Sequence, residues 1–265
     1  MSEVPRTQCA ETMNALREEL QRAAEERSTE GLRTHRADGN GPVEDRRVGD
    51  RPAEEPPPAA DLVSDFERTL ADHERKLGPD HPDTLRARSN LGGACQQAGH
   101  QDRAVRLFEE TLADGERVLG PDHPDTLTFR NNLAGGHESA GDPAHAIPLY
   151  EQALAGRERV LGPDNLLTLQ CRDNLARAHE LTDAPAQAIP LHERTVTDRE
   201  RTLGPGHPYT LLSRGNLAFT HHKAGNGELS VEMFAHTLTD SERHLGSDHP
   251  ATERIRQLLT HVRSA

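Results

Sequence analysis

Tryptophan is absent from this 265-residue chain, and aromatic residues together make up only 3% of it. With 33% hydrophobic residues, a single globular domain of this length would have a thin core. A solenoid needs only a narrow apolar stripe between stacked units, so the same composition is sufficient for a repeat architecture.

Lysine is nearly absent as well, because Lys76 and Lys223 are the only two and all other basic side chains are arginine or histidine. This bias, beside abundant Ala, Gly and Pro, is typical of proteins from GC-rich bacterial genomes. The formal net charge is −13, and affinity for nucleic acid depends on Lys and Arg groups that neutralise phosphates. The acidic balance therefore argues against a nucleic-acid partner.

Cysteines are scarce, and long apolar runs are missing. Cys9, Cys95 and Cys171 are odd in number and unclustered, which favours a reducing, cytoplasmic location over a disulfide framework. The first residues lack the apolar segment of a signal peptide, and no run approaches 18 apolar residues. We therefore expect a cytoplasmic protein with no membrane partner.

The sequence does contain a strict repeat. The hexapeptide Leu77-Gly-Pro-Asp-His-Pro82 returns unchanged at Leu119 and in degraded form at Leu161, Leu203 and Leu245, each start 42 residues after the last. A fixed period of this length is the signature of a solenoid. Because stacked units create an extended surface, the pattern favours a protein that holds another molecule.

Two helical stretches alternate within each period. In the first full period, apolar residues recur at helical spacing between Pro82 and Ala98 and again between Asp102 and Leu119. Gly99 stands where a left-handed residue ends a helix, and Gly141 and Gly225 repeat it, although Asp183 departs. We expect about ten helices over residues 61–265, and hence an all-α fold.

Residues 1–60 differ in composition from the repeats. Met13, Leu16 and Leu20 have helical spacing and predict a short, isolated helix over about residues 7–27. Residues 28–60 carry scattered Gly, Arg, Asp and Glu and end in a run of prolines. Such a stretch cannot bury enough apolar surface to offset chain entropy, so we expect a disordered linker. The predicted organisation is an N-terminal tail over 1–60 and a repeat solenoid over 61–265.

The repeated unit resembles a known family. Asn90-Leu91-Gly92 with Ala104 and Phe108 is similar to a tetratricopeptide repeat, and the 42-residue length and the linker resemble its kinesin-light-chain type. The resemblance covers about residues 61–263. It implies a right-handed α-solenoid of tetratricopeptide helix pairs. In that family, the first helices of the pairs line a concave groove that holds short peptide segments.

The resemblance also implies which side chains face this groove. Its recurrent groove-side asparagines correspond to Asn90, Asn132, Asn174 and Asn216. A helical wheel adds Arg177, Phe219, His222 and Lys223 in the third and fourth pairs, where the first two pairs have glycine at the equivalent position. Aromatic and Arg side chains dominate binding hot spots, so we expect these two pairs to anchor a peptide. Phe219 has an alternative interpretation as a core residue.

A second set of residues forms a ladder of opposite charges. Each arginine of the set follows a glutamate by 14 residues, and the helical wheel places the arginines on the packing side of the helix. We interpret the set as a structural ion-pair ladder, with anion binding as the alternative. The predicted pairs are Glu74–Arg88, Glu116–Arg130, Glu158–Arg172 and Glu200–Arg214.

Histidines recur in register too, at His137, His179 and His221. Equivalent residues of stacked helix pairs lie too far apart to converge on one zinc ion, so we expect core packing rather than a metal site. The linker histidines, such as His123, have the position of capping or turn groups. No zincin, phosphate-loop or nucleophile-elbow motif is present, and we expect neither a cofactor nor enzymatic activity.

Two functional hypotheses remain open from the sequence. The first is a non-catalytic scaffold or adaptor that binds a protein or peptide segment in the concave groove. The alternative is a detached regulatory or sensory repeat module of a signalling ATPase or a transcriptional regulator, which rests on family analogy alone. Self-association through the solenoid is a third possibility.

Overall fold

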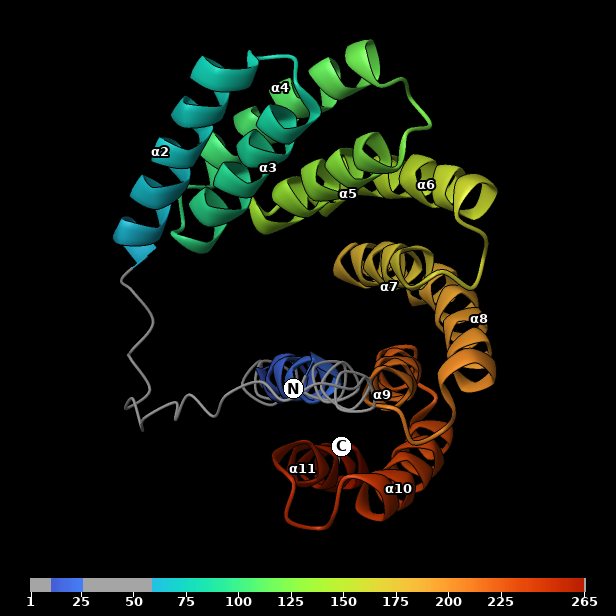
Figure 1. The fold of residues 1–265 in the computed structure, drawn as a ribbon. Helices are drawn as coiled ribbons and strands as arrows, with labels where there is room; N and C mark the ends of the chain where they lie inside the picture. The colour runs from blue at the N-terminus through green and yellow to red at the C-terminus, as the bar shows by residue number, and fades with distance from the viewer. Residues whose placement is uncertain (1–10, 26–58, 265) are drawn as a thin grey trace, which may run out of the picture. The chain divides into compact units, whose positions relative to one another are not determined.

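The computed structural model describes residues 11–25 and 59–264, and these residues form α-helices joined by short turns, with no strand among them (Figure 1). They fall into two compact units, which we describe separately. The α2–α7 unit contains α2 (Ala59–Leu77), α3 (Pro82–Gln97), α4 (Gln101–Val118), α5 (Pro124–Ser139), α6 (Pro143–Val160) and α7 (Leu166–Leu181). The α8–α11 unit contains a helix over residues 11–25, called the N-terminal helix below, with α8 (Pro185–Leu203), α9 (Pro208–Lys223), α10 (Gly227–His244) and α11 (Pro250–Ser264).

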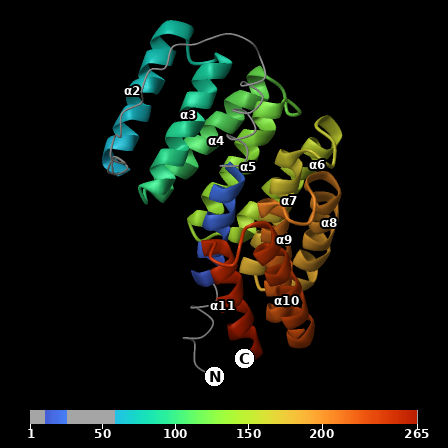
Figure 2. The ribbon, with the colours of Figure 1, turned by 60° about the horizontal axis from the view of Figure 1, so that its bottom comes forward.

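Within each unit, helices that follow one another in sequence pack against one another, as α3 does with α4 and α9 with α10 (Figure 2). In the α2–α7 unit the first helix of each pair also contacts the first helix of the next, so that α3, α5 and α7 adjoin in order. This arrangement confirms the predicted all-α fold of stacked tetratricopeptide-type helix pairs.

The turn between successive pairs has one geometry throughout the described repeats. Its glycine has a φ between 87° and 101° at all five positions. This backbone conformation is accessible to glycine at little cost because glycine lacks a Cβ atom. The five residues are Gly78, Gly120, Gly162, Gly204 and Gly246.

The next helix begins on a side-chain cap three residues after this glycine. The backbone N–H of Asp125 donates to Nδ1 of His123 at 3.1 Å, and His81, His207 and His249 accept in the same way. Asn165 occupies this place in the third linker and accepts from the N–H of Leu167 at 2.9 Å. The predicted capping role of the linker histidines is therefore confirmed.

The turn inside each pair also has a left-handed residue. After α3, Gly99 has a φ of 79° and the N–H of His100 donates to the carbonyl of Cys95 at 2.8 Å, which satisfies a carbonyl at the helix end. Asp183 takes the same place after α7 with a φ of 56°. The departure noted in the sequence thus changes the residue type but not the backbone conformation.

Glycines inside α3 and α5 allow the helices to approach one another closely around Phe108. A Cβ atom on Gly92 would lie 2.6 Å from the ring of Phe108, and one on Gly136 would lie 2.9 Å from the same ring. Phe108 is buried and joins Leu85, Cys95 and other side chains of α2 to α5 in one apolar cluster. These glycines lower helix propensity, but they make room for the large ring of Phe108 in this core.

The N-terminal helix is packed rather than isolated, which differs from the sequence-based expectation. Met13, Leu16 and Leu20 are buried in one cluster with side chains of α9, α10 and α11. A 15-residue helix is marginally stable in water by itself, so burial of its apolar stripe explains why it is bound. The structure begins α2 at Ala59, and the remainder of the predicted linker lies outside the described residues.

The adjacent glycines of α3 should respond in opposite ways to alanine substitution. Gly92→Ala adds a methyl group against Phe108 and should lower the free energy of unfolding by about 1 kcal/mol or more, because overpacking costs more than helix propensity returns. Gly93 has no atom within 4 Å of the added Cβ, so Gly93→Ala should raise it by up to about 1 kcal/mol. Urea unfolding followed by circular dichroism measures both. Equal effects of the two changes would contradict this packing.

The linker caps give a second stability prediction. His123→Ala removes the acceptor for the N–H of Asp125 and should cost about 1 kcal/mol. His123→Asn should keep the stability within about 0.5 kcal/mol of the parent chain, because Asn165 already caps α7 in this position. Thermal unfolding of both variants is the measurement, and a His123→Asn chain as unstable as His123→Ala would refute the capping role.

Candidate peptide-binding groove

The first helices of the α2–α7 unit line an open hollow of about 390 Å³. Its walls come mainly from α3, α5 and α7, which adjoin one another in the stack. The lining combines polar side chains with a floor that includes Phe66, Phe108 and Tyr150. It has the position that the sequence assigned to the concave groove.

Side-chain amides dominate the polar part of this lining. Asn90, Asn132 and Asn174, which are 42 residues apart, all line the hollow, together with Gln96, Gln97 and Asn131. An amide group both donates and accepts, so it can bind a peptide backbone whatever the sequence of that peptide. Side-chain amides from the first helices of three successive pairs therefore line the hollow.

The amides are oriented by hydrogen bonds between neighbouring first helices. Asn132 Nδ2 donates to Ser89 Oγ at 3.0 Å, and Asn174 Nδ2 donates to Asn131 Oδ1 at 3.4 Å. Each amide has two N–H groups and an acceptor oxygen, so one such bond leaves capacity for a ligand. Fixing the amides in advance reduces the entropy cost of binding.

The charge of Arg177 is compensated inside the groove. Its guanidinium lies 2.9 Å from the carboxylate of Glu138, whose side chain is only 7% exposed. The Tyr150 hydroxyl donates to the same carboxylate at 3.5 Å, and burial raises the pKa of this phenol well above its ordinary value. Arg177 does line the hollow, as expected from the sequence, but as half of an ion pair.

Gly93 and Gly135 contribute to the hollow by having no side chain. A Cβ atom on Gly93 would meet nothing within 4 Å, and one on Gly135 would meet only the Tyr150 hydroxyl, at 3.5 Å. Both residues line the hollow, and their missing side chains leave space in it.

The predicted groove residues of α9 have different surroundings. Asn216 is 6% exposed, and its Oδ1 accepts a hydrogen bond from Arg17 of the N-terminal helix at 3.3 Å. Phe219 is partly buried against the apolar cluster of the α8–α11 unit, which corresponds to the alternative interpretation of this residue as core. His222 has an edge-on ring contact with His261, and Lys223 is exposed at the end of α9.

The glutamates and arginines of the ladder are in contact on the packing side of the helices. Arg130 lies 2.6 Å from Glu116, Arg172 lies 3.0 Å from Glu158, and Arg214 lies 2.7 Å from Glu200. The pair Arg88–Glu74 is longer, at 3.8 Å, and Arg88 is also 2.7 Å from Asp114. These four guanidinium groups are largely buried while the glutamates are partly exposed, so the pairs join each repeat to the next and do not line the groove.

Two further buried arginines were missed by the sequence analysis. Arg157 is 2% exposed and donates to the carbonyl of Leu167 at 2.7 Å, and burial lowers the pKa of its guanidinium. Arg199, 42 residues later, donates to the carbonyl of Tyr209 at 3.1 Å and lies 5.5 Å from the centre of its ring. Gly115 occupies the equivalent position one repeat earlier. Because this position is not arginine in every repeat, the repeat pattern did not reveal the two arginines.

The histidines and cysteines give no sign of a metal centre in the described residues. No group of three or more His, Cys, Asp or Glu side chains there could hold a metal ion. His221 is buried, and burial raises the pKa of the Cys171 thiol to about 11. None of the helices in residues 11–25 and 59–264 is long and apolar enough to cross a membrane.

The ladder can be tested at Arg130 and Glu116. Arg130→Met should lower the free energy of unfolding by about 1–3 kcal/mol, since it removes a charge-assisted hydrogen bond and leaves Glu116 without its partner. As a control, Arg159→Met removes an exposed ion pair with Asp122 and should cost less than about 1 kcal/mol. Urea unfolding measures both, and equal losses would contradict a structural role for the buried pair.

Comparison with known proteins places this architecture in a family. Two sequence-family profiles, both described as tetratricopeptide repeat, match the chain, one at residues 107–159 and 131–201 and the other at 63–83, 84–125 and 210–251. No curated protein matches.

Solved structures add relatives of the kinesin-light-chain type. A Podosopora anserina putative kinesin light chain with nearly identical tetratricopeptide-like repeats is 27% identical, with a TM-score of 0.61 over 69% of this chain and 95% of its own. BtubC (bKLC) from P. vanneervenii shares the fold at 15% identity, with a TM-score of 0.61 over 78% of this chain and 91% of its own. The chain therefore belongs to the tetratricopeptide repeat family, and its repeats are of the kinesin-light-chain-like type.

Proposed function

We propose that this protein is a non-catalytic interaction module that binds an extended segment of a partner protein in the groove of α3, α5 and α7. Both family models that match this chain describe tetratricopeptide repeats, which are in general protein-interaction scaffolds. The observation that carries the proposal is the row of amides formed by Asn90, Asn132 and Asn174 in an open hollow. The partner is a protein or peptide, and no cofactor is required.

The chemistry of the hollow favours a backbone-directed mode of binding. The amides of three successive first helices can pair with the N–H and C=O groups of an extended chain, much as a neighbouring strand would. Asn132 and Asn174 are already held by hydrogen bonds to the first helix of the preceding pair, to Ser89 and Asn131 respectively. An extended segment could therefore bind without reorganising the groove.

The charge of the groove favours an uncharged segment. The Arg177 guanidinium is paired with Glu138, so it does not provide the free cation that an acidic peptide or a terminal carboxylate would need. Of the aromatic side chains at the hollow, Phe108 and Tyr150 are almost fully buried, whereas Phe66 is only partly buried and can offer its ring for apolar contact. We expect a ligand with few charges and an apolar side chain directed at Phe66.

The location of Cys95 and Cys171 is consistent with a cytoplasmic site of action. Both are buried as free thiols, and burial raises the pKa of each. A cytoplasmic protein needs no disulfide at these positions. We therefore retain the cytoplasmic location as part of the proposal.

The proposal can be tested with peptides selected against the full-length protein from a random library. Asn132→Ala should weaken binding of the selected peptides about tenfold, equivalent to about 1.4 kcal/mol, because it removes an amide from the centre of the row. Gly93→Gln should weaken binding at least as much, because its side chain would project into the hollow. Fluorescence anisotropy measures the affinities, and circular dichroism checks that helicity is kept.

A matched control is Gln152→Ala, which removes an exposed amide of α6 that does not line the hollow. It should leave the affinity unchanged. Asn216→Ala should also have little effect, because Asn216 is buried beside Arg17. If Asn216→Ala weakens binding and Asn132→Ala does not, the site lies at α9, as the sequence analysis expected, and the proposal for α3, α5 and α7 is wrong.

A further inference from the structure

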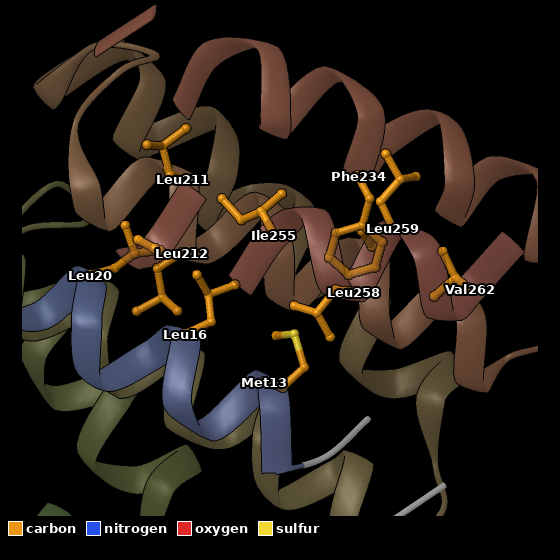
Figure 3. Close-up of a cluster of buried hydrophobic side chains, with 12 residues drawn as sticks. Met13, Leu16, Leu20, Leu211, Leu212, Phe234, Ile255, Leu258, Leu259 and Val262 are labelled. Atoms are coloured by element: carbon orange, nitrogen blue, oxygen red, sulfur yellow. The ribbon is translucent and has the colours of Figure 1, made fainter. Parts of the chain in front are cut away.

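In the α8–α11 unit the N-terminal helix covers an apolar surface. The N-terminal helix lies against α9 and α11 and is separated from α8 by far more than a hundred residues of sequence. Figure 3 shows Met13, Leu16 and Leu20 directed toward the apolar side chains of these helices. We call the surface formed by Leu212, Gly215, Asn216, Ile255, Leu258 and Leu259 the helix-binding surface.

The contact has the features of ligand recognition. Leu16 and Leu20 are fully buried, and Ala23 and Ala24 are buried one turn further on, so the helix is held along most of its length. Its opposite face, which includes Asn14, Glu18 and Gln21, is exposed. An amphipathic helix with anchors at this spacing, laid on an apolar surface, is a recurring mode of peptide recognition.

Polar and steric details fix the position of the helix. Arg17 Nη2 donates to Asn216 Oδ1 at 3.3 Å, which is a specific bond next to the apolar anchors. Gly215 provides space for Leu16, since a Cβ atom on Gly215 would lie 3.4 Å from Leu16 Cδ2 and within 4 Å of no other residue outside α9. The absence of a side chain at Gly215 therefore makes room for Leu16 of the N-terminal helix and is not needed for the packing of α9 itself.

We propose that the helix-binding surface is a receptor for an amphipathic helix and that residues 11–25 of the same chain are its resident ligand. A partner helix that competes for it would need apolar residues at positions equivalent to Met13, Leu16 and Leu20. It would also need small residues equivalent to Ala23 and Ala24, because both alanines are buried in the contact. This surface recognises a helix, whereas the groove of α3, α5 and α7 is proposed to take an extended segment, so the two sites are independent.

The chain's own helix competes with any partner helix for this surface and so lowers the apparent affinity for the partner. A tethered ligand acts at a high effective concentration, so a free helix of equal intrinsic affinity binds weakly until the resident helix is weakened. Changes that remove the anchors of the N-terminal helix should therefore open the surface. This consequence is measurable with the full-length protein and without knowledge of a natural partner.

The probe is a fluorescent peptide of residues 11–25, titrated into the full-length protein. The double variant Leu16→Asp/Leu20→Asp should bind the probe at least tenfold more tightly than the parent chain, because its own helix no longer competes. The matched control Asn14→Asp/Gln21→Asp adds the same two charges to the exposed face of the helix and should bind the probe as weakly as the parent chain. Equal affinity of all three proteins, or no binding by the double variant, would overturn the proposal.

A third substitution shows whether the probe binds at the helix-binding surface or at another place on the double variant. Adding Gly215→Gln to Leu16→Asp/Leu20→Asp should abolish probe binding, because the new side chain would occupy the place of Leu16. Adding Gly93→Gln instead should leave probe binding intact, because Gly93 lies in the α2–α7 unit. Retained binding in the Gly215→Gln protein would show that the peptide binds elsewhere and would refute the assignment.

Light scattering identifies the source of the resident helix. A monomeric parent chain supports occupation within one molecule. A dimer that the Leu16→Asp/Leu20→Asp change converts to a monomer would show that the helix comes from a second copy, and would overturn the statement that it binds its own chain. Failure of the probe experiment leaves the proposed function of the α3, α5 and α7 groove unaffected, because no residue of that groove takes part.

Discussion

The turn between helix pairs is the constraint on which the stacking depends. A solenoid of equal units requires that the chain reverse in the same way after every pair. Here a glycine with φ near 90° ends one pair, and a side-chain cap opens the next. In two of the turns a threonine also ties the ends together, since Thr84 donates to the carbonyl of Gly78 and Thr252 to that of Gly246, both at 2.8 Å. Repetition of this geometry keeps equivalent residues of successive pairs on the same face.

The ion pairs between Glu and Arg extend the same constraint across the turn. Each glutamate lies near the end of one pair and each arginine in the first helix of the next, so the bridge spans the reversal of the chain. Because the guanidinium groups are buried, the pairs restrict the relative position of the helices more than an exposed pair would. They also occupy the packing side, which leaves the groove side for amides and glycines.

The two units present these groove-side residues differently. In the α2–α7 unit, Asn132 and Asn174 line an open hollow whose depth comes from Gly93 and Gly135. In the α8–α11 unit the equivalent Asn216 is covered and bonded to Arg17 of the N-terminal helix. One repeated scaffold thus offers an amide-lined groove in one unit and an apolar surface filled by a helix in the other.

Much of this fold could be predicted from the sequence, because a constant repeat length places equivalent residues of successive repeats on the same face of their helices. The helix pairs, the linker caps and the groove position of Gly93 follow from a 42-residue period and a helical wheel, and that of Asn132 from the resemblance to the family. The packing of the N-terminal helix could not be predicted, because Met13, Leu16 and Leu20 show an apolar stripe but not the surface that buries it. Likewise, the sequence shows that Gly92 lowers helix propensity, but not that its missing side chain accommodates the ring of Phe108.

We expect a partner to enter the groove of α3, α5 and α7 while the N-terminal helix remains bound to α9 and α11. Hydrogen exchange of the full-length protein, measured by mass spectrometry with and without a selected peptide, tests this most directly. The peptide should slow exchange in α3, α5 and α7, and residues 11–25 should be protected in both states. Slower exchange in α9, together with loss of protection in residues 11–25 when the peptide binds, would contradict it.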